Sequence, residues 1–395
     1  MKKTWEQRKL GEIATVTKLA GFEFTKYVSY SDVGRVLAIR GLNIKNGDFN
    51  LHDVKYIDNS NFTKLTRSKL KHGDILFTYV GTIGNSAIVP ENVNWYLAPN
   101  VCLIRTINNV SGFIGQLIRS NKFQNHEIPK WITTSSQPSL SMKNIRKFLV
   151  TLPSNNEQFR IDKFLSLIDT LFSLQQRKLK QLKRLKKAML QQLLVSKKDR
   201  LTPNVRFSDF SGSWKKCKLG EVIQDYIEKT IVENQYPILT SSQQHGIILQ
   251  NEYFSGSRVS KTGNIGYFIL PRGYFAYRNR SDNDTYVFNR NDCIDREIIS
   301  RFYPVFKPYN ADSNFLLIRL NNGLRKELSL ASEGTGQHVL SLKNFKNIQT
   351  QFPNLEEQHK IGDFISTLNS LIALHQRKAN ILSNLKKFLL QKLFI

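Results

Sequence analysis

The side chains of this 395-residue chain whose types and spacing could do chemistry are basic, amide and hydroxyl groups, which gather in short stretches of both halves. Lysine and arginine neutralise phosphates, while arginine, asparagine and glutamine can read base edges through paired hydrogen bonds. We therefore expect contacts to a nucleic acid, with a solvated basic surface and ordinary turns as the alternative interpretation. The candidates are Lys64, Arg67, Lys69, Lys71, Tyr79, Thr82, Ser135, Ser136, Gln137, Arg258, Lys261, Arg278, Arg280, Thr335, Gln337 and His338.

No catalytic or cofactor-binding signature accompanies these residues. The sequence lacks a G-x-x-x-x-G-K-[ST] phosphate loop, a G-x-G-x-x-G turn that opens a helix, and a His/Cys cluster with metal-ligand spacing. The seven histidines are scattered, and His375 is better explained as a packed polar residue than as a base. We therefore expect no catalytic residue and no cofactor or metal bound by this chain, which favours a recognition protein over an enzyme.

The charge balance indicates the kind of partner. The chain has 58 Lys and Arg against 31 Asp and Glu, a formal net charge of +27, and a pI near 9.9. Such a charge favours a polyanion, above all a nucleic acid, with a merely basic protein as the alternative. Three cysteines without paired spacing fit a reducing cytosol, and no apolar run approaches the roughly 18 residues that span a bilayer.

The elements that must position these residues occur twice. Ser141–Asn144 returns as Ser341–Asn344, 200 residues later, and the similarity continues without a gap into the residues that follow. Trp5, with its Leu-Gly-Glu, returns at Trp214, 209 residues later. A repeat of this length predicts one α/β front followed by one long helix, present twice.

Each front is predicted to be mixed α/β, because short apolar runs are broken by glycine and asparagine. Asp74–Val80 is predicted to be a buried strand that enters the turn Gly81–Gly84. Gly263–Gly266, 182 residues further on, is expected to be the matching turn, with Ser257–Lys261 in the place of Gly73–Phe77. The unequal offsets predict two fronts that share a fold and differ in their loops.

The back of each repeat is predicted to be a long helix. Ser154 and Asn354 precede Glu157 and Glu357 by three residues, as a capping box requires. Heptad spacing then gives each helix an apolar seam, interrupted at the same level by polar residues. We expect the seams to pack together as an antiparallel coiled coil, with packing of each helix on its own front as the alternative. The seam residues are Ile161, Phe164, Ile168, Leu171, Leu182, Leu185, Ile361, Phe364, Leu368, Leu371, Leu382 and Leu385.

These features resemble the specificity subunit of a type I restriction-modification enzyme over nearly the whole chain. The resemblance rests on Trp-x-x-x-x-Leu-Gly-Glu at the start of each half and on the lead-in Pro203–Phe207 before the second. It also rests on the Gly73–Phe77 strand with its glycine turn. Finally, Leu152-Pro153 and Phe352-Pro353 each lead into Glu-Gln and a long helix.

The resemblance implies an α+β fold: two target recognition domains joined by two long antiparallel helices in a coiled coil, with an internal pseudo-twofold repeat. The expected segments are 1–152 (first recognition domain), 153–196 (first helix), 197–352 (linker and second recognition domain) and 353–395 (second helix). Each domain would read one half of a split, asymmetric site in double-stranded DNA. Two methylation subunits and two restriction/translocase subunits would be partners in the bacterial cytoplasm, and they would use S-adenosylmethionine, ATP and Mg²⁺.

The helices would then act as a ruler between the half-sites. A helix of about 38 residues is about 57 Å long, which matches about 13 to 17 base pairs. Two other classes of protein are the alternatives: part of a fused methyltransferase-nuclease, which would need cofactor motifs that are missing here, and a non-catalytic scaffold whose charge binds RNA or acidic proteins.

Overall fold

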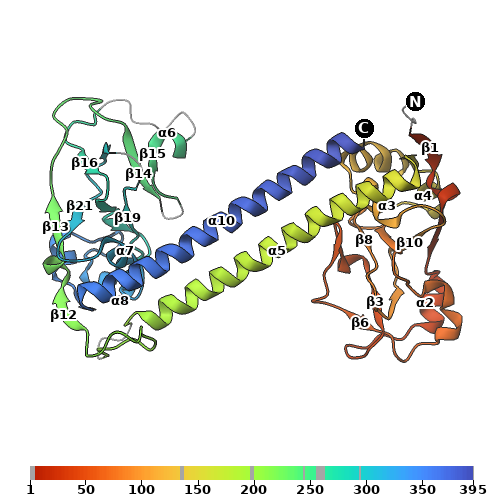
Figure 1. Ribbon diagram of the computed structural model, residues 1–395, viewed down its shortest axis with the longest axis horizontal. Coiled ribbons are helices and arrows are strands. Elements are labelled where there is room, and N and C mark those ends of the chain that lie inside the picture. Colours follow the sequence, from red (N-terminus) through yellow and green to blue (C-terminus); the bar gives the residue numbers. More distant parts are fainter. Residues whose placement is uncertain are drawn as a thin grey trace. The chain divides into compact units, whose positions relative to one another are not determined.

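The computed structural model describes residues 5–133, 138–195, 200–242, 245–254, 263–292 and 295–394. The chain divides into two compact units. Unit 1 contains residues 1–177 and 376–395, and unit 2 contains residues 178–375. Each unit therefore combines one front with part of both long helices (Figure 1).

Each front is built on a four-stranded antiparallel sheet. In unit 1 the strand order is β2 (Ala14–Lys18), β10 (Val101–Thr106), β7 (Ile75–Thr78) and β8 (Ser86–Ile88). In unit 2 it is β13 (Ile223–Tyr226), β21 (Val305–Pro308), β17 (Phe275–Tyr277) and β19 (Phe288–Arg290). Most of these strands are rich in β-branched and aromatic residues, and their buried side chains form the core of each unit with α3 (Ser111–Ile118) or α7 (Ser313–Asn321).

Each front also has a second sheet, of three strands in unit 1 and four in unit 2, that contains one parallel pair. In unit 1 its order is β6 (Lys55–Tyr56), β3 (Leu37–Ile39) and β9 (Trp95–Leu97). In unit 2 it is β15 (Gly246–Leu249), β14 (Ile238–Ser242), β20 (Arg296–Ile299) and β16 (Phe268–Pro271). The remaining antiparallel pairs are β1 (Glu6–Lys9) with β11 (Leu149–Leu152), β12 (Lys215–Lys218) with β23 (Gln349–Phe352), β4 (Ile44–Lys45) with β5 (Asp48–Phe49), and β18 (Arg280–Ser281) with β22 (His338–Val339).

Short helices and helical turns complete the fronts. The helices are α1 (Leu10–Ile13), α2 (Gly21–Tyr27) and α4 (Met142–Arg146) in unit 1, and α6 (Gln250–Tyr253), α8 (Arg325–Ala331) and α9 (Leu342–Asn347) in unit 2. The turns are η1 (Gly41–Asn43), η2 (Phe62–Lys64), η3 (Thr66–Ser68), the π-helical η4 (Phe123–Glu127), η5 (Ile128–Trp131) and η6 (Leu219–Glu221).

Backbone hydrogen bonds show which strands of the two fronts are equivalent. Gly73 N donates to Val89 O at 3.0 Å, and Gly273 N donates to Asn291 O at 2.7 Å. These bonds lie at the same place between β7 and β8 as between β17 and β19. β7 therefore matches β17 at an offset of 200 residues. The equivalent of Gly73–Phe77 is thus not Ser257–Lys261, a segment that lies outside the described residues.

The predicted match between the two glycine turns is wrong. Gly81–Gly84 joins β7 to β8, whereas Gly263–Gly266 precedes β16. The equivalent of Gly81–Gly84 is the connection from β17 to β19, which has no Gly-x-x-Gly. The sequence prediction failed because two glycines three apart satisfy many kinds of turn and identify none.

The two long helices are present where the sequence predicts them. They are α5 (Asn155–Leu193) and α10 (Leu355–Leu393), each of 39 residues. Glu157 N donates to Ser154 Oγ at 3.4 Å, and Glu357 N donates to Asn354 Oδ1 at 2.9 Å, so both predicted caps are confirmed. The side chain of Glu357, which was expected to reach back to the cap, instead binds Trp214 and Arg206.

The apolar seam of each helix is only half as predicted. Ile168, Leu182, Ile361 and Leu368 are buried, as expected for the first heptad series. The expected second series is largely exposed: Phe164 by 49%, Leu171 by 39%, Leu185 by 42%, Leu371 by 38% and Leu385 by 40%. The buried partners of the first series lie one residue later, at Leu165 (0% exposed), Ile365 (2%) and Ala379 (3%). Apolar residues occur at both positions, so two stripes on each helix fit the same heptad spacing. Only the packing shows which of the two stripes is buried.

Candidate nucleic-acid interface

Two polar loops lie side by side in unit 2. The first is the connection from β17 to β19 (Arg278–Val287), called here the β17–β19 loop. The second is Glu333–His338, called here the pre-α9 loop. The pairing of β18 with β22 joins them, and Leu340 N donates to Asn279 O at 2.8 Å just beyond. Both loops therefore share one polar surface.

The Ser-x-Lys-Asn motif holds the pre-α9 loop in place. Ser341 caps α9 by accepting from Asn344 N at 3.1 Å. Asn344 Nδ2 donates to Glu333 Oε1 at 2.8 Å and to Ala331 O at 3.0 Å. One serine thus starts the helix while one asparagine ties the loop to it, which gives this short motif a structural role.

The β17–β19 loop is organised by its own side chains. Ser281 Oγ accepts from Asn283 N at 3.3 Å and from Thr285 N at 3.0 Å. Gln337 Nε2 donates to Asp282 Oδ1 at 3.2 Å, and His338 Nδ1 lies 2.9 Å from Asp284 Oδ1. These contacts fix both loops before any ligand binds.

A polar cavity of about 550 Å³ opens beside these loops. Its lining combines guanidinium, amide, carboxylate and hydroxyl groups with aromatic rings. The lining residues are Thr240, Ser241, Ser242, Tyr253, Phe254, Arg278, Arg280, Ser281, Asp282, Asn283, Thr285, Val287 and Tyr303. Arginine reads guanine, asparagine reads adenine, and a carboxylate accepts from cytosine, so this lining carries the groups that direct base readout uses.

Unit 1 has the same arrangement of loops. Leu140 N donates to Tyr79 O at 2.9 Å, which corresponds to the bond from Leu340 to Asn279 in unit 2. Isolated bridges join Val80 to Ser139 and Thr133 to Ser139. The bridges of Val80 and Thr133 to Ser139 correspond to those of Arg280 and Glu333 to Val339 in unit 2, whereas residues 134–137 lie outside the described residues.

Comparison with known proteins agrees with this doubled architecture. A sequence model described as "Type I restriction modification DNA specificity domain" matches the chain twice, over residues 2–184 and 212–384. The chain belongs to this family. The type I restriction enzyme MjaVIII specificity subunit of Methanocaldococcus jannaschii is 22% identical over 83% of this chain and 80% of that protein.

Two further proteins of the specificity family are similar to this chain, one in sequence over a part of it and one in fold over its whole length. The type I restriction enzyme EcoBI specificity subunit of Escherichia coli is 31% identical over 31% of this chain and 26% of that protein. A crystal structure of the type I restriction-modification system S subunit from M. genitalium covers 100% of this chain and 97% of that one, with a TM-score of 0.60 and 12% identity. At that identity the likeness shows a shared fold.

In unit 2 the structure brings most of the predicted contacts together. Arg278 and Arg280 line the cavity, and both side chains are exposed. Thr335 and Gln337 are exposed on the adjoining loop, and His338 is half-buried. Arg280 also lies over the ring of Phe302, with Cζ 4.5 Å from the centroid. Arg258 and Lys261 lie outside the described residues.

In unit 1 the predicted contacts separate into two groups. One group is basic and exposed, and it precedes β7 in the chain, on and after η2 and η3: Lys64, Arg67, Lys69 and Lys71. The loop that follows β7, Tyr79–Asn85, lies beyond the other end of that strand. A strand rises about 3.3 Å per residue, so the four-residue β7 alone keeps the groups about 13 Å apart. Arg67 Nη2 is also engaged by Glu23 Oε1 at 2.6 Å. The basic run is therefore a separate surface from the loops.

Two predicted residues just after β7 differ in their exposure. Thr82 is exposed on the loop. Tyr79 is only 9% exposed and packs in the core of unit 1, and burial raises the pKa of its hydroxyl. The ring of Tyr79 therefore serves packing, and its contact with nucleic acid stays a prediction. Ser135, Ser136 and Gln137 lie outside the described residues.

The sequence prediction missed most of the cavity lining, since only Arg278 and Arg280 were among the predicted contacts. Thr240 and Ser241 come from β14 and Tyr253 from α6, elements that are distant in sequence from the two loops. The polar run Asp282–Thr285 carried a usable signal, since four turn-forming residues interrupt two apolar strands. Nothing in the sequence indicated the contribution of β14.

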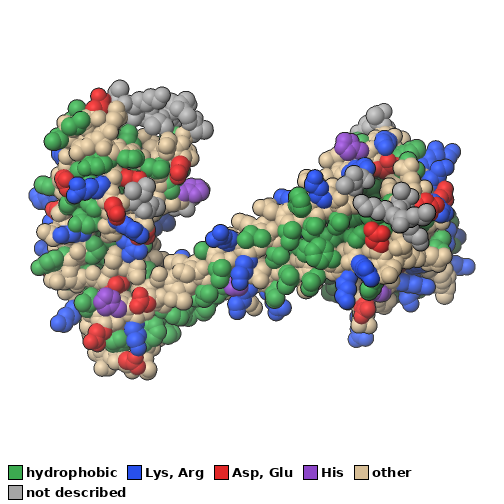
Figure 2. Space-filling view, turned by 45° about the horizontal axis from the view of Figure 1, so that its top comes forward, with side chains coloured by type: hydrophobic (Ala, Val, Ile, Leu, Met, Phe, Trp, Pro, Cys, Tyr) green, Lys and Arg blue, Asp and Glu red, His purple; other side chains and the backbone are tan. Residues whose placement is uncertain are grey.

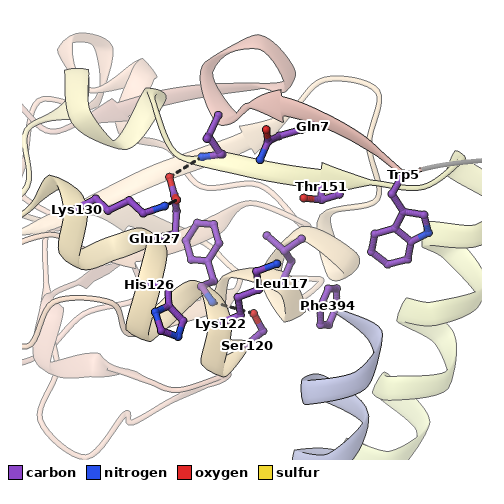
Figure 3. A pocket seen from close by; sticks show the side chains of 12 residues that line it. Trp5, Gln7, Leu117, Ser120, Lys122, His126, Glu127, Lys130, Thr151 and Phe394 are labelled. Atoms are coloured by element: carbon purple, nitrogen blue, oxygen red, sulfur yellow. Dashed lines mark hydrogen bonds and ion pairs between the residues drawn. The ribbon is translucent and has the colours of Figure 1, made fainter.

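Unit 1 contains a second cavity, of about 140 Å³, close to Trp5 and the end of α10 (Figure 3). Leu117 and Phe394 form part of its apolar lining. In unit 2 the residue equivalent to Leu117 is Arg319, whose guanidinium donates to Val195 O at 2.7 Å and is 1% exposed. A long side chain thus fills in unit 2 the space that is open in unit 1.

Metal clusters and membrane-spanning helices are both absent from the described residues. Within those residues, no group of three or more His, Cys, Asp or Glu side chains is placed to hold a metal ion. No helix there is long and apolar enough to cross a membrane.

Proposed function

We propose that this chain is the DNA specificity subunit of a type I restriction-modification complex. It binds a bipartite, asymmetric DNA site in the cytoplasm and directs methyltransferase and ATP-dependent nuclease subunits to that site. The observation that carries the proposal is the doubled loop pair, set before the same Ser-x-Lys-Asn motif in both units of a chain of the specificity family. In this role the chain catalyses nothing, and S-adenosylmethionine, ATP and Mg²⁺ serve the partner subunits.

Each loop pair reads one half-site. The excess of 27 positive charges supplies attraction to the DNA backbone, while the loops supply the groups that distinguish bases. The β17–β19 loop carries Arg278, Arg280, Asp282 and Asn283, whereas its equivalent in unit 1, Tyr79–Asn85, is shorter and carries no charge. Different groups at equivalent places support two different half-sites.

The long helices set the gap between the half-sites as an antiparallel coiled coil. Two contacts support this pairing. In unit 1, Lys386 Nζ of α10 lies 2.5 Å from Asp169 Oδ1 of α5. In unit 2, Leu182 of α5 belongs to the same buried cluster as Ile361 and Leu368 of α10. The early part of each helix therefore meets the late part of the other.

A deletion tests the ruler. Removing one heptad from each helix shortens it by about 10 Å, or about three base pairs. We expect the gap in the methylated motif to change by that amount, with both half-sites unchanged. Removal of a single heptad from α5 alone is the control, because it breaks the register and should abolish binding. An unchanged gap after the paired deletion would refute the ruler.

The exposed apolar stripe on the helices is the docking surface for the methylation subunits. On α5 in unit 1 it comprises Phe164, Leu167, Leu171 and Leu174, three of which are at least 49% exposed. On α10 in unit 1 it continues with three exposed residues at the level of the contact between Lys386 and Asp169: Ile381, Leu385 and Phe388. We call these seven residues the partner face of unit 1. Figure 2 shows hydrophobic side chains gathered on the helices of this unit. Contiguous apolar surface of this kind marks a protein interface.

The equivalent face of unit 2 is less apolar. Thr367, Gln181 and Ala188 stand where unit 1 has Leu167, Ile381 and Phe388. The two faces therefore offer their partners different amounts of apolar surface, although they share the same frame.

Reconstitution tests the function as a whole. The chain is combined with the methylation subunits of its own restriction-modification system, and modified adenines are mapped on genomic DNA. We expect one split motif with a fixed gap, and no methylation by the chain alone with S-adenosylmethionine. Sequence-selective retention of that duplex over random DNA at roughly 150 mM salt distinguishes this role from a basic scaffold. Methylation by the isolated chain, or equal retention of both DNAs, would refute the proposal.

A further inference from the structure

Unit 2 contains a buried ion pair that its own lead-in segment completes. Arg206 donates from Nε and Nη2 to the two carboxylate oxygens of Glu357, at 2.8 and 2.6 Å. Trp214 Nε1 donates to the same carboxylate at 3.3 Å, and the side chain of Glu357 is 1% exposed. The next residue, Phe207, packs edge-on against Phe364, with ring centroids 6.1 Å apart. An arginine followed by an aromatic residue therefore covers this end of α10.

Unit 1 has the same acceptor without this cover. Trp5 Nε1 donates to Glu157 Oε1 at 3.3 Å, as Trp214 does to Glu357. Trp5 and Trp214 each pack edge-on against an equivalent phenylalanine, with ring centroids 5.9 Å apart in both units. Glu157, however, is exposed, and within the described residues of unit 1 its carboxylate pairs with no lysine or arginine. The carboxylate and its tryptophan are preformed, and among the described residues of unit 1 no guanidinium pairs with them.

The apolar part of this surface is open as well. Phe164 is 49% exposed, whereas its equivalent Phe364 is half-buried against Phe207. Phe164 is also the first residue of the partner face of unit 1. The open acceptor is thus continuous with the surface assigned to a methylation subunit.

We propose that Trp5, Glu157 and Phe164 form a receptor for an arginine followed by an aromatic residue, supplied by the methylation subunit that docks on unit 1. The inference rests on the proposed function, because it takes the partner from there. The ligand chemistry comes from unit 2, where the same three positions bind the pair Arg206-Phe207. A planar guanidinium matches a carboxylate with two parallel hydrogen bonds, which neither a metal ion nor a DNA phosphate provides at this site.

The two methylation subunits therefore meet unequal sites. The receptor of unit 2 is filled by its own Arg206, so the subunit that docks there gains no such ion pair. The receptor of unit 1 holds no guanidinium from the residues that the structure describes, and the face around it is more apolar. The first methylation subunit to bind occupies unit 1.

Substitution of Glu157 by glutamine tests the receptor in the full chain. We expect Glu157→Gln to weaken the tighter of the two binding steps about 10- to 100-fold, since a charge-assisted pair is lost, and to leave the weaker step unchanged. Titration followed by native mass spectrometry separates the two steps. Glu356→Gln is the matched control, because it removes an exposed carboxylate from the first turn of α10 outside either receptor. Glu157 is exposed, so the variant should fold normally, and circular dichroism checks this.

A photo-reactive phenylalanine at position 164 identifies the occupant in the assembled complex. We expect a cross-link to a partner peptide that contains an arginine beside an aromatic residue. A cross-link that stays within this chain, or equal binding by the Glu157→Gln variant, would overturn the receptor and leave the proposed function intact. Failure of the unaltered chain to bind any methylation subunit would instead refute the proposed function.

Discussion

Replacing Arg206 by methionine should destabilise unit 2 strongly. The substitution keeps much of the side-chain volume and removes the guanidinium. The side chain of Glu357, which is 1% exposed, would then have only Trp214 Nε1 at 3.3 Å to compensate its charge. Removing one partner of a buried ion pair costs more than the pair contributes, because the remaining charge is left without water and without a counter-ion.

The expected magnitude follows from this burial. Breaking a buried pair in this way costs about 3 to 5 kcal/mol. For a unit of about 200 residues, 1 kcal/mol shifts the melting temperature by about 2 to 4 °C, so the melting temperature of unit 2 should fall by about 6 to 20 °C. The double variant Arg206→Met with Glu357→Gln should recover much of this loss, since the uncompensated charge is gone.

Unit 1 supplies the matched control. Glu157 holds the equivalent position but is exposed, so Glu157→Gln should change the free energy of unfolding by no more than about 0.5 kcal/mol. Scanning calorimetry gives the melting temperatures, and hydrogen exchange of β12 and of the first turns of α10 assigns the change to unit 2. Equal shifts for Arg206→Met and Glu157→Gln, or no recovery in the double variant, would refute the account of the buried pair.

Three further predictions concern the cavity, the seam and a buried carboxyl. Arg280→Ala should weaken binding of the cognate duplex by about 1 to 3 kcal/mol in fluorescence anisotropy. Arg272 is exposed outside the cavity, so Arg272→Ala should weaken binding less. Equal losses would exclude the cavity as the surface that reads the bases. Leu165→Ala should destabilise unit 1 by about 2 to 5 kcal/mol and Phe164→Ala by much less in thermal denaturation, and the reverse order would restore the first seam prediction. Burial raises the pKa of Glu297, and the charge of Glu252 adds to that shift. Stability should therefore fall as the pH rises above the ordinary carboxyl pKa, and Glu297→Gln should remove that fall. Melting temperatures of the two proteins that change in parallel from pH 4 to 8 would contradict this.

The doubled order of front and helix follows from the amino-acid sequence alone. An internal repeat with constant spacing identifies equivalent residues without knowledge of the fold, so Ser141 and Ser341 were correctly matched. The first residues of α5 and α10 were also predictable, because a cap residue acts on a backbone NH only three residues away. Local interactions of this kind depend only on residues that are close together in the sequence.

Only the tertiary structure decided which of two apolar stripes on each helix is buried, since Phe164 and Leu165 are equally suited by type and spacing. It also decided that β7 matches β17, because the hydrogen bonds between strands fix that register and a pair of glycines does not. The cavity lining and the pairing of Arg206 with Glu357, 151 residues apart, depend on segments that meet only in the folded chain. Burial and long-range pairing are properties of three-dimensional packing. A sequence pattern is compatible with several packing arrangements, and only the folded chain shows which one forms.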